Sequence, residues 1–175
     1  MSDGVRQRPV VAIPVGEMVL SWAAMVIGSA VAAWLIEERT PRSTALGALL
    51  LIPGVLLATA SLRALGPGTF MVSTGPYRWV RHPYYLAILV MLLGAIIALQ
   101  AWAVLVLYIP VTRLTLERAR REEHNLQLRF EDAYAEYQRH VPFLLPLGPP
   151  LPREGLAAAI ATGLGLDEQG SQERS

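Results

Sequence analysis

Residues 84–112, YYLAILVMLLGAIIALQAWAVLVLYIPVT, form an apolar run that is too long for one membrane-spanning helix. Crossing a hydrocarbon core of about 30 Å takes about 20 helical residues. Gln100, near the middle of the run, is the position at which we expect a tight turn. The run therefore predicts a helical hairpin of two short or tilted helices, over about residues 84–98 and 101–116. A single over-long helix is the alternative.

Two further apolar segments precede this hairpin. Residues 18–36 contain no charged side chain, and Trp22 and Trp34 stand near their ends, as interfacial anchors do. Residues 44–62 form the second segment, and we expect a kink at its centre because Pro53 has no N–H to donate. A signal peptide is the alternative for the first segment, but the apolar run is longer than a signal peptide needs and more spans follow it.

The arginines orient the four predicted spans. Both ends of a four-span chain lie on the same side of the membrane, and that side carries most of the positive charge. The arginines there are Arg6, Arg8, Arg63, Arg78, Arg81 and those from Arg113 to Arg139. The opposite side carries only Arg39 and Arg42 in one loop. Because cytoplasmic loops of membrane proteins are rich in Lys and Arg, both termini and the arginine-rich side are predicted to be cytoplasmic.

The composition agrees with an integral membrane protein. Of the 175 residues, 53% are hydrophobic and the mean hydropathy is +0.39, whereas ordinary soluble domains are about 45–50% apolar. The net charge of +1 offers no bulk field to attract a nucleic acid. The absence of cysteine excludes disulfides and thiolate chemistry, and three scattered histidines lack metal-site spacing. We therefore expect an all-α membrane protein that binds neither nucleic acid nor metal.

A charged helix, LERARREEHNLQLRFEDAYAEYQRH over residues 116–140, is predicted after the hairpin. Its apolar residues recur at helical spacing and form one stripe, made of Leu126, Phe130, Tyr134, Tyr137 and Val141. Since the hairpin leaves and re-enters the same side of the membrane, this helix should pack on the mouth of the hairpin. Glu122 shares the face of the stripe, whereas Glu123 is rotated by about 100° and is expected to be turned away.

Residues 74–85, TGPYRWVRHPYY, place two arginines, a histidine and four aromatic side chains at the start of the third span. His82 precedes Pro83, which favours an extended backbone and fixes where the helix begins. Anchoring at headgroup depth accounts for Trp79 and Arg78, and leaves His82, Tyr77 and Tyr85 to be explained. With Glu122, the remaining polar groups suit an amino-acid zwitterion: donors for its carboxylate, a carboxylate for its ammonium or for ribose hydroxyls, and rings for a base.

The two motifs resemble those of the isoprenylcysteine carboxyl methyltransferase and phospholipid methyltransferase superfamily of membrane enzymes. GPYRWVRHPYYLA, residues 75–87, is similar to the family's Gly-x-Tyr…Arg-His-Pro-x-Tyr-x-Gly pattern. REEHNLQLRFEDAYAEYQRHVPFLLP, residues 121–146, is similar to its Glu-Glu-x-x-Leu…Phe-Gly-x-x-Tyr-x-x-Tyr…Val-Pro ending. The resemblance covers about residues 65–146. It has two departures, because Ala87 and Glu131 stand where the family usually has glycine.

The resemblance implies S-adenosylmethionine as the methyl donor, held over the hairpin mouth, and a lipophilic acceptor that enters from the bilayer. It assigns cofactor contacts to Tyr77, His82, Pro83, Tyr84, Tyr85 and Glu122, with Thr69, Phe70, Met71 and Val72 closing over the cofactor. Arg118 falls where the carboxyl-methylating branch places a substrate-contacting arginine. The simpler interpretation of Arg118 is a surface ion pair with Glu122, one helical turn away. Alignment and a dry site are the main needs of methyl transfer from a sulfonium, so no catalytic acid or base is assigned.

The expected function is carboxyl O-methylation of an isoprenylcysteine-like or other lipidic acid, since an arginine beside the acceptor would repel an amine. N-methylation of a phospholipid headgroup amine, an NADPH-dependent enzyme similar to the membrane sterol reductases, and a non-catalytic membrane scaffold are the alternatives. Residues 1–65 are expected to hold the first two spans, and residues 66–146 the methyltransferase core. Residues 147–175 are expected to form a proline-rich linker and a mostly disordered tail, in which residues 155–166 form a small surface helix.

Overall fold

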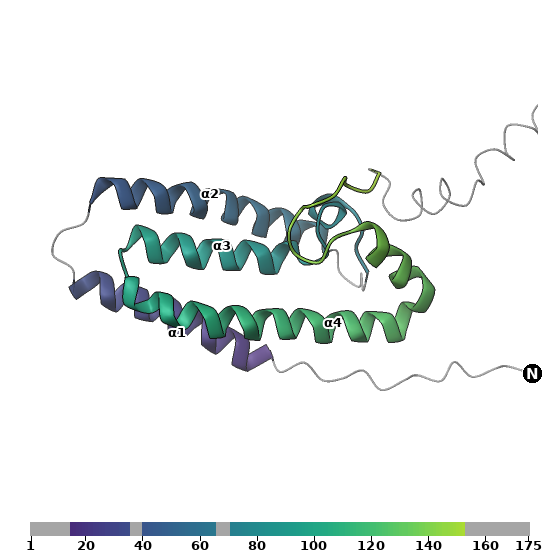
Figure 1. Cartoon of the computed structure of the whole chain (residues 1–175), viewed down its shortest axis with the longest axis horizontal. Coiled ribbons are helices and arrows are strands. Elements are labelled where there is room, and N and C mark those ends of the chain that lie inside the picture. The colour runs from purple at the N-terminus through teal and green to yellow at the C-terminus, as the bar shows by residue number, and fades with distance from the viewer. Residues whose placement is uncertain (1–14, 36–39, 66–70, 153–175) are drawn as a thin grey trace, which may run out of the picture.

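The computed structural model describes residues 15–35, 40–65 and 71–152 (Figure 1). Within these ranges every regular element is helical, which confirms the all-α class. The four long helices are α1 (Val15–Leu35), α2 (Pro41–Ala64), α3 (Pro83–Ala98) and α4 (Leu105–His140), joined by the short 3-10 helices η1 (Gly75–Arg78) and η2 (Trp102–Val104). The predicted tail helix over residues 155–166 lies outside the described residues.

The predicted hairpin is formed by α3 and the first part of α4. Proline fits the first position of a helix, where no N–H is needed, and α3 begins at Pro83 as expected. Gln100 adopts a φ of 53° in the turn that follows α3, which excludes a single over-long helix. The side-chain amide of Gln100 donates through Nε2 to Thr40 Oγ1 and accepts through Oε1 from the Thr40 backbone N–H, both at 3.2 Å. These two bonds tie the hairpin turn to the start of α2.

Small side chains allow α2 and α3 to lie against each other along their length (Figure 1). The buried residues of α2 are Ser43, Gly47, Gly54 and Ser61. A Cβ added at Gly47 would lie only 2.5 Å from the carbonyl oxygen of Gly94, so the two backbones are in close contact. Ala87 is fully buried, and its carbonyl oxygen faces Gly54 of α2. Pro53 is exposed, and α2 continues through it.

The last helix is longer than predicted and is interrupted near its end. α4 joins the fourth predicted span and the charged segment into one element, but Glu131 has non-helical backbone angles of φ 42° and ψ −113°. Beyond this residue the chain folds back toward the start of α3 (Figure 1). The prediction of one continuous stripe is therefore wrong. Its members pack against one another across the bend, in a cluster that holds Tyr134, Tyr137, Val141, Leu151, Met71, Leu126 and Phe130.

The backbone at Glu131 suits glycine, the residue common at this position in the family. Its angles resemble those of the first central residue of a type II′ turn, and a side chain held in such a region costs about 1–3 kcal/mol. We expect Glu131→Gly to raise the free energy of unfolding by about 1 kcal/mol, measured by thermal unfolding in detergent. Ala133→Gly, at an exposed helical position nearby, is the matched control and should lower it by about as much. An equal fall in the free energy of unfolding for both variants would contradict this account.

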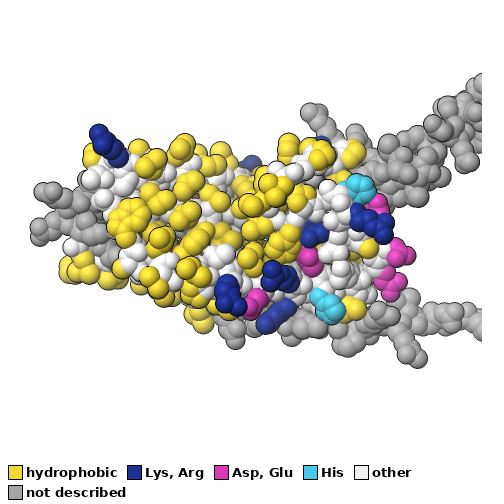
Figure 2. Space-filling view, viewed as in Figure 1, with side chains coloured by type: hydrophobic (Ala, Val, Ile, Leu, Met, Phe, Trp, Pro, Cys, Tyr) yellow, Lys and Arg dark blue, Asp and Glu magenta, His cyan; other side chains and the backbone are white. Residues whose placement is uncertain are grey.

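The outside of the helices is apolar, and charge collects at one end. Figure 2 shows an apolar surface over the helices and most of the Arg, Asp, Glu and His side chains at the opposite end from the hairpin turn. The exposed apolar side chains include Leu20, Ile27, Trp34, Leu49, Ile52, Val106 and Ile109. Among the described residues, only Pro41–Ala64 is long and apolar enough to span a membrane alone, and Val19–Val31 and Pro83–Ala98 are shorter apolar segments. The number of spans stays a prediction.

Candidate active site

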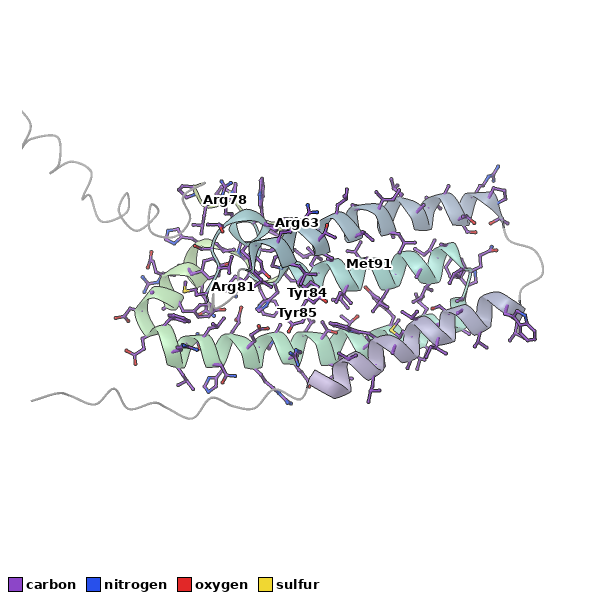
Figure 3. All side chains as sticks on the ribbon, turned by 180° about the vertical axis from the view of Figure 1, so that it is seen from behind. Arg63, Arg78, Arg81, Tyr84, Tyr85 and Met91 are labelled. Carbon is purple, nitrogen blue, oxygen red and sulfur yellow. The ribbon has the colours of Figure 1, made fainter. Side chains whose placement is uncertain are left out.

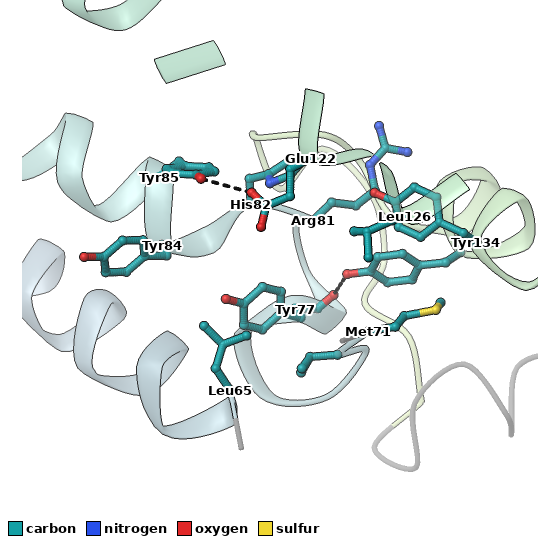
Figure 4. A pocket seen from close by; sticks show the side chains of 12 residues that line it. Leu65, Met71, Tyr77, Arg81, His82, Tyr84, Tyr85, Glu122, Leu126 and Tyr134 are labelled. Carbon is teal, nitrogen blue, oxygen red and sulfur yellow. Dashed lines mark hydrogen bonds between the residues drawn. The ribbon is translucent and has the colours of Figure 1, made fainter. Parts of the chain in front are cut away.

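A cavity of about 120 Å³ lies at the charged end of the molecule, between η1, the start of α3, and α4 (Figure 4). Figure 3 shows that Arg81, Tyr84 and Tyr85 lie at the same end of the helices as Arg63 and Arg78. The lining residues are Leu65, Met71, Val72, Tyr77, Arg81, His82, Tyr84, Tyr85, Glu122, Leu126, Tyr134 and Tyr137. The two motifs, which are far apart in the sequence, thus meet around one cavity.

Most of the residues to which the resemblance assigns cofactor contacts border this cavity. They are Met71, Val72, Tyr77, His82, Tyr84, Tyr85 and Glu122. Pro83 is buried at the first position of α3 and is not among the lining residues, and Arg118 is placed behind Tyr85. Thr69 and Phe70 lie outside the described residues.

Five lining residues were not predicted from the sequence. Leu65 directly follows α2, and Leu126, Tyr134 and Tyr137 were assigned to packing along one helix face. The bend at Glu131 brings the two tyrosines back to the cavity. Arg81 was counted only as a positive charge on the cytoplasmic side. A glycine at position 131 would have signalled the bend, and the glutamate there gives no such signal.

Tyr85 stands between two charged side chains of α4. Its hydroxyl donates to Glu122 Oε2 at 3.0 Å and accepts from Arg118 Nε at 2.8 Å. The hydroxyl therefore bridges the carboxylate that lines the cavity and the guanidinium behind it. Arg118 Nη1 is also buried, and no hydrogen-bond partner is found for it among the described residues. Arg118 Nη1 is thus a buried donor that no described residue satisfies, although Arg118 itself does not line the cavity.

The first helix covers this group on its outer side. The indole ring of Trp22 lies 6.4 Å from the ring of Tyr85, and its Nε1 donates to Thr115 Oγ1 of α4 at 3.2 Å. Tyr85 and the fully buried Ala119 share a small apolar cluster with Trp22. An N-terminal helix outside both motifs thus helps to keep water away from Tyr85.

Glu123 is turned inward, so the prediction that it faces away is wrong. It is only 9% exposed, and its Oε1 lies 2.8 Å from Arg81 Nε and 3.0 Å from His82 Nε2. Its Oε2 accepts a hydrogen bond from Gln138 Nε2 at 3.1 Å. Two neighbouring glutamates can both point inward because α4 is covered on two sides, by the segment before α3 and by its own end beyond the bend.

Three tyrosines of the cavity, Tyr77, Tyr134 and Tyr137, remain neutral hydrogen-bonding groups. Burial, with smaller effects of Glu122 and Tyr84, raises the pKa of Tyr77 to about 12. Burial likewise raises the pKa of Tyr134 and of Tyr137. Tyr137 donates its hydroxyl proton to the Tyr77 carbonyl at 2.6 Å, which holds η1 against the end of α4. At physiological pH these phenols keep their protons, so they bind polar groups without adding charge.

The cavity combines groups that suit a zwitterion. Glu122 and the faces of several tyrosine rings attract a cation. Arg81 offers guanidinium N–H groups to a carboxylate, and Leu65, Met71 and Leu126 supply apolar walls. The volume is below the about 300–1,000 Å³ of typical ligand sites, so a ligand of nucleoside size must move side chains or extend beyond the cavity.

The chain combines an apolar helical exterior with a polar, tyrosine-rich cavity at one end, and one comparison with known families finds a match. Residues 57–128 match the isoprenylcysteine carboxyl methyltransferase family. The matched residues include the whole first motif and the start of the second, so they agree with the resemblance that the two motifs indicated. No curated protein and no solved structure matches the chain significantly.

Proposed function

We propose that the protein transfers a methyl group from S-adenosylmethionine to the carboxylate of an isoprenylcysteine-like or other lipidic acid. The observation that carries this proposal is the cavity in which both motifs meet. Glu122 lines this cavity, and Arg118 is joined to Glu122 through the Tyr85 hydroxyl. Glu122 offers a carboxylate to the methyl donor, and Arg118 offers a guanidinium to the acceptor.

The chemistry of the lining residues fits the methyl donor. Glu122 suits the ammonium or the ribose hydroxyls, Arg81 suits the carboxylate, and the tyrosine rings and apolar side chains suit the base and the sulfonium. When bound, S-adenosylmethionine supplies an electrophilic methyl group on its sulfonium. The chain's own residues bind and orient the reactants and exclude water, which accounts for most of the rate enhancement of an in-line displacement.

The acceptor's charge follows from the surroundings of Arg118. Its buried Nη1 has no partner among the described residues and favours an anion, whereas an amine acceptor carries a positive charge that this guanidinium repels. A carboxylate acceptor is already ionised at neutral pH, so the site needs no general base. These two features favour O-methylation over N-methylation of a headgroup amine.

We expect the label from a methyl-labelled donor to be released as methanol by base, because methyl esters hydrolyse in base and N-methyl groups do not. Membranes that contain the enzyme provide both the lipids and the acceptor for this measurement. Arg118→Ala should lower the base-labile label at least tenfold. Arg120→Ala, which removes an exposed arginine from the same helix, should leave it within twofold of the unmodified enzyme. Base-stable label that does not depend on Arg118 would contradict carboxyl methylation.

We also propose four membrane spans with the cavity and both termini in the cytoplasm. The apolar exterior of the helices and the charge at the cavity end support this topology (Figure 2). Reporter fusions at Gly75 and at Ser175 are expected to give cytoplasmic signals, and a fusion at Pro41 an external one. An external signal at Gly75 would contradict both the topology and access of a cytosolic methyl donor.

A further inference from the structure

Glu123 does not line the cavity, yet its carboxylate joins three separate parts of the chain. It belongs to α4, it contacts Arg81 and His82 just before α3, and it accepts a hydrogen bond from Gln138 beyond the bend. The side chains of Arg81, His82 and Glu123 are only 13%, 6% and 12% exposed, respectively. Charged contacts with so little access to water are much less screened than surface ion pairs.

The residues that Glu123 contacts are held by further bonds. Arg81 donates through Nη1 to the Gln138 carbonyl at 3.1 Å, and its backbone N–H donates to the Pro142 carbonyl at 3.0 Å. The rings of His82 and Phe143 meet edge-on at 4.9 Å, and the guanidinium of Arg81 lies 5.7 Å from the same Phe143 ring. Glu123 is thus the one carboxylate in a cluster that connects the start of α3 to the end of α4.

Two members of this cluster, Arg81 and His82, line the cavity, and so does Glu122. The side chain of Arg81 is long and carries a permanent charge. Without Glu123, the carboxylate left for Arg81 among the lining residues is Glu122. A guanidinium that moved to Glu122 would neutralise the negative group of the cavity and occupy part of its small volume.

We propose that Glu123 is a positioning residue of the methyl-donor site, which holds Arg81 and His82 at the cavity wall and keeps Glu122 free for the ligand. The two adjacent glutamates then have different tasks, because Glu122 contacts the ligand and Glu123 orders the residues around it. This inference rests on the proposed function, since it presumes that the cavity binds S-adenosylmethionine.

The test is the affinity for S-adenosylhomocysteine, measured by calorimetry on full-length protein in detergent. We expect Glu123→Gln to weaken binding at least tenfold, and Glu117→Gln, at an exposed position of the same helix, to change it less than twofold. If Glu123 acts through Arg81 and His82, adding Glu123→Gln to the Arg81→Ala/His82→Ala double variant should change affinity less than twofold. A merely structural role would lower the melting temperature and leave the affinity of the folded protein unchanged.

Three results would overturn the inference. The first is wild-type affinity in folded Glu123→Gln, and the second is a tenfold loss that persists in the double-variant background. The third concerns Glu123→Asp, which is used if Glu123→Gln does not fold. This variant keeps the charge but withdraws it by one methylene, so its affinity for S-adenosylhomocysteine should still fall at least threefold. Unchanged affinity of Glu123→Asp is the third contradicting result. Wild-type protein that does not bind S-adenosylhomocysteine would overturn the proposed function itself, and this role with it.

Discussion

Replacing Glu122 with glutamine should weaken binding of S-adenosylhomocysteine at least tenfold, a loss of about 1.4 kcal/mol. The substitution keeps the shape of the side chain and its bond from Tyr85, but it removes the negative charge that faces the cavity. His82→Ala should cost at least as much, because the imidazole lines the same cavity. Calorimetric titration of each purified variant measures the effect.

The matched control for Glu122→Gln is Glu117→Gln, which removes an exposed carboxylate from the same helix. It should bind the ligand with wild-type affinity. Similar affinities for both variants and the wild type would show that the charge of Glu122 has no part in binding.

A leucine in place of Gly47 should separate α2 from α3 and lower the free energy of unfolding by about 3 kcal/mol or more. Extra methylenes in a packed interior typically cost about 1–3 kcal/mol, and here the first added carbon already meets the Gly94 carbonyl and the Ala98 backbone nitrogen, each at 2.5 Å. Backbone atoms cannot rotate away as a side chain can. Thermal unfolding in detergent should show a large fall in melting temperature.

Gly28→Ala provides the control for this packing prediction. Its added Cβ would lie 3.8 Å from Val104 Cγ2, an ordinary contact, and alanine favours the helix over glycine by about 1 kcal/mol. Its melting temperature should equal or exceed that of the wild type. A Gly47→Leu variant as stable as Gly28→Ala would refute the close contact between α2 and α3.

The order of the helices could be predicted because apolar length and proline position depend on local sequence. Pro83 begins α3 and Gln100 marks the turn, as expected from the residues alone. The bend at Glu131 could not be predicted, since a glutamate with positive φ gives no local signal. It is stabilised by distant contacts, such as the hydrogen bond from Tyr137 to the Tyr77 carbonyl.

The same bend explains why the positions of Glu123 and Tyr134 could not be predicted from the sequence. A helical wheel treats α4 as a straight helix with one buried side, and on that basis it places Glu122 inward and Glu123 outward. The chain beyond Glu131 covers a second side, so Glu123 is buried against Gln138. Tyr134 also returns to the cavity by this route. Periodicity thus placed Leu126, Tyr134 and Tyr137 on one helix face, and the tertiary fold brought all three to the cavity.

The most direct test of the account is a titration of the purified wild-type protein with S-adenosylhomocysteine and, separately, with NADPH. The proposed function predicts saturable binding of one S-adenosylhomocysteine per chain and no binding of NADPH. Saturable binding of NADPH without binding of S-adenosylhomocysteine would contradict the assignment of the cavity to a methyl donor.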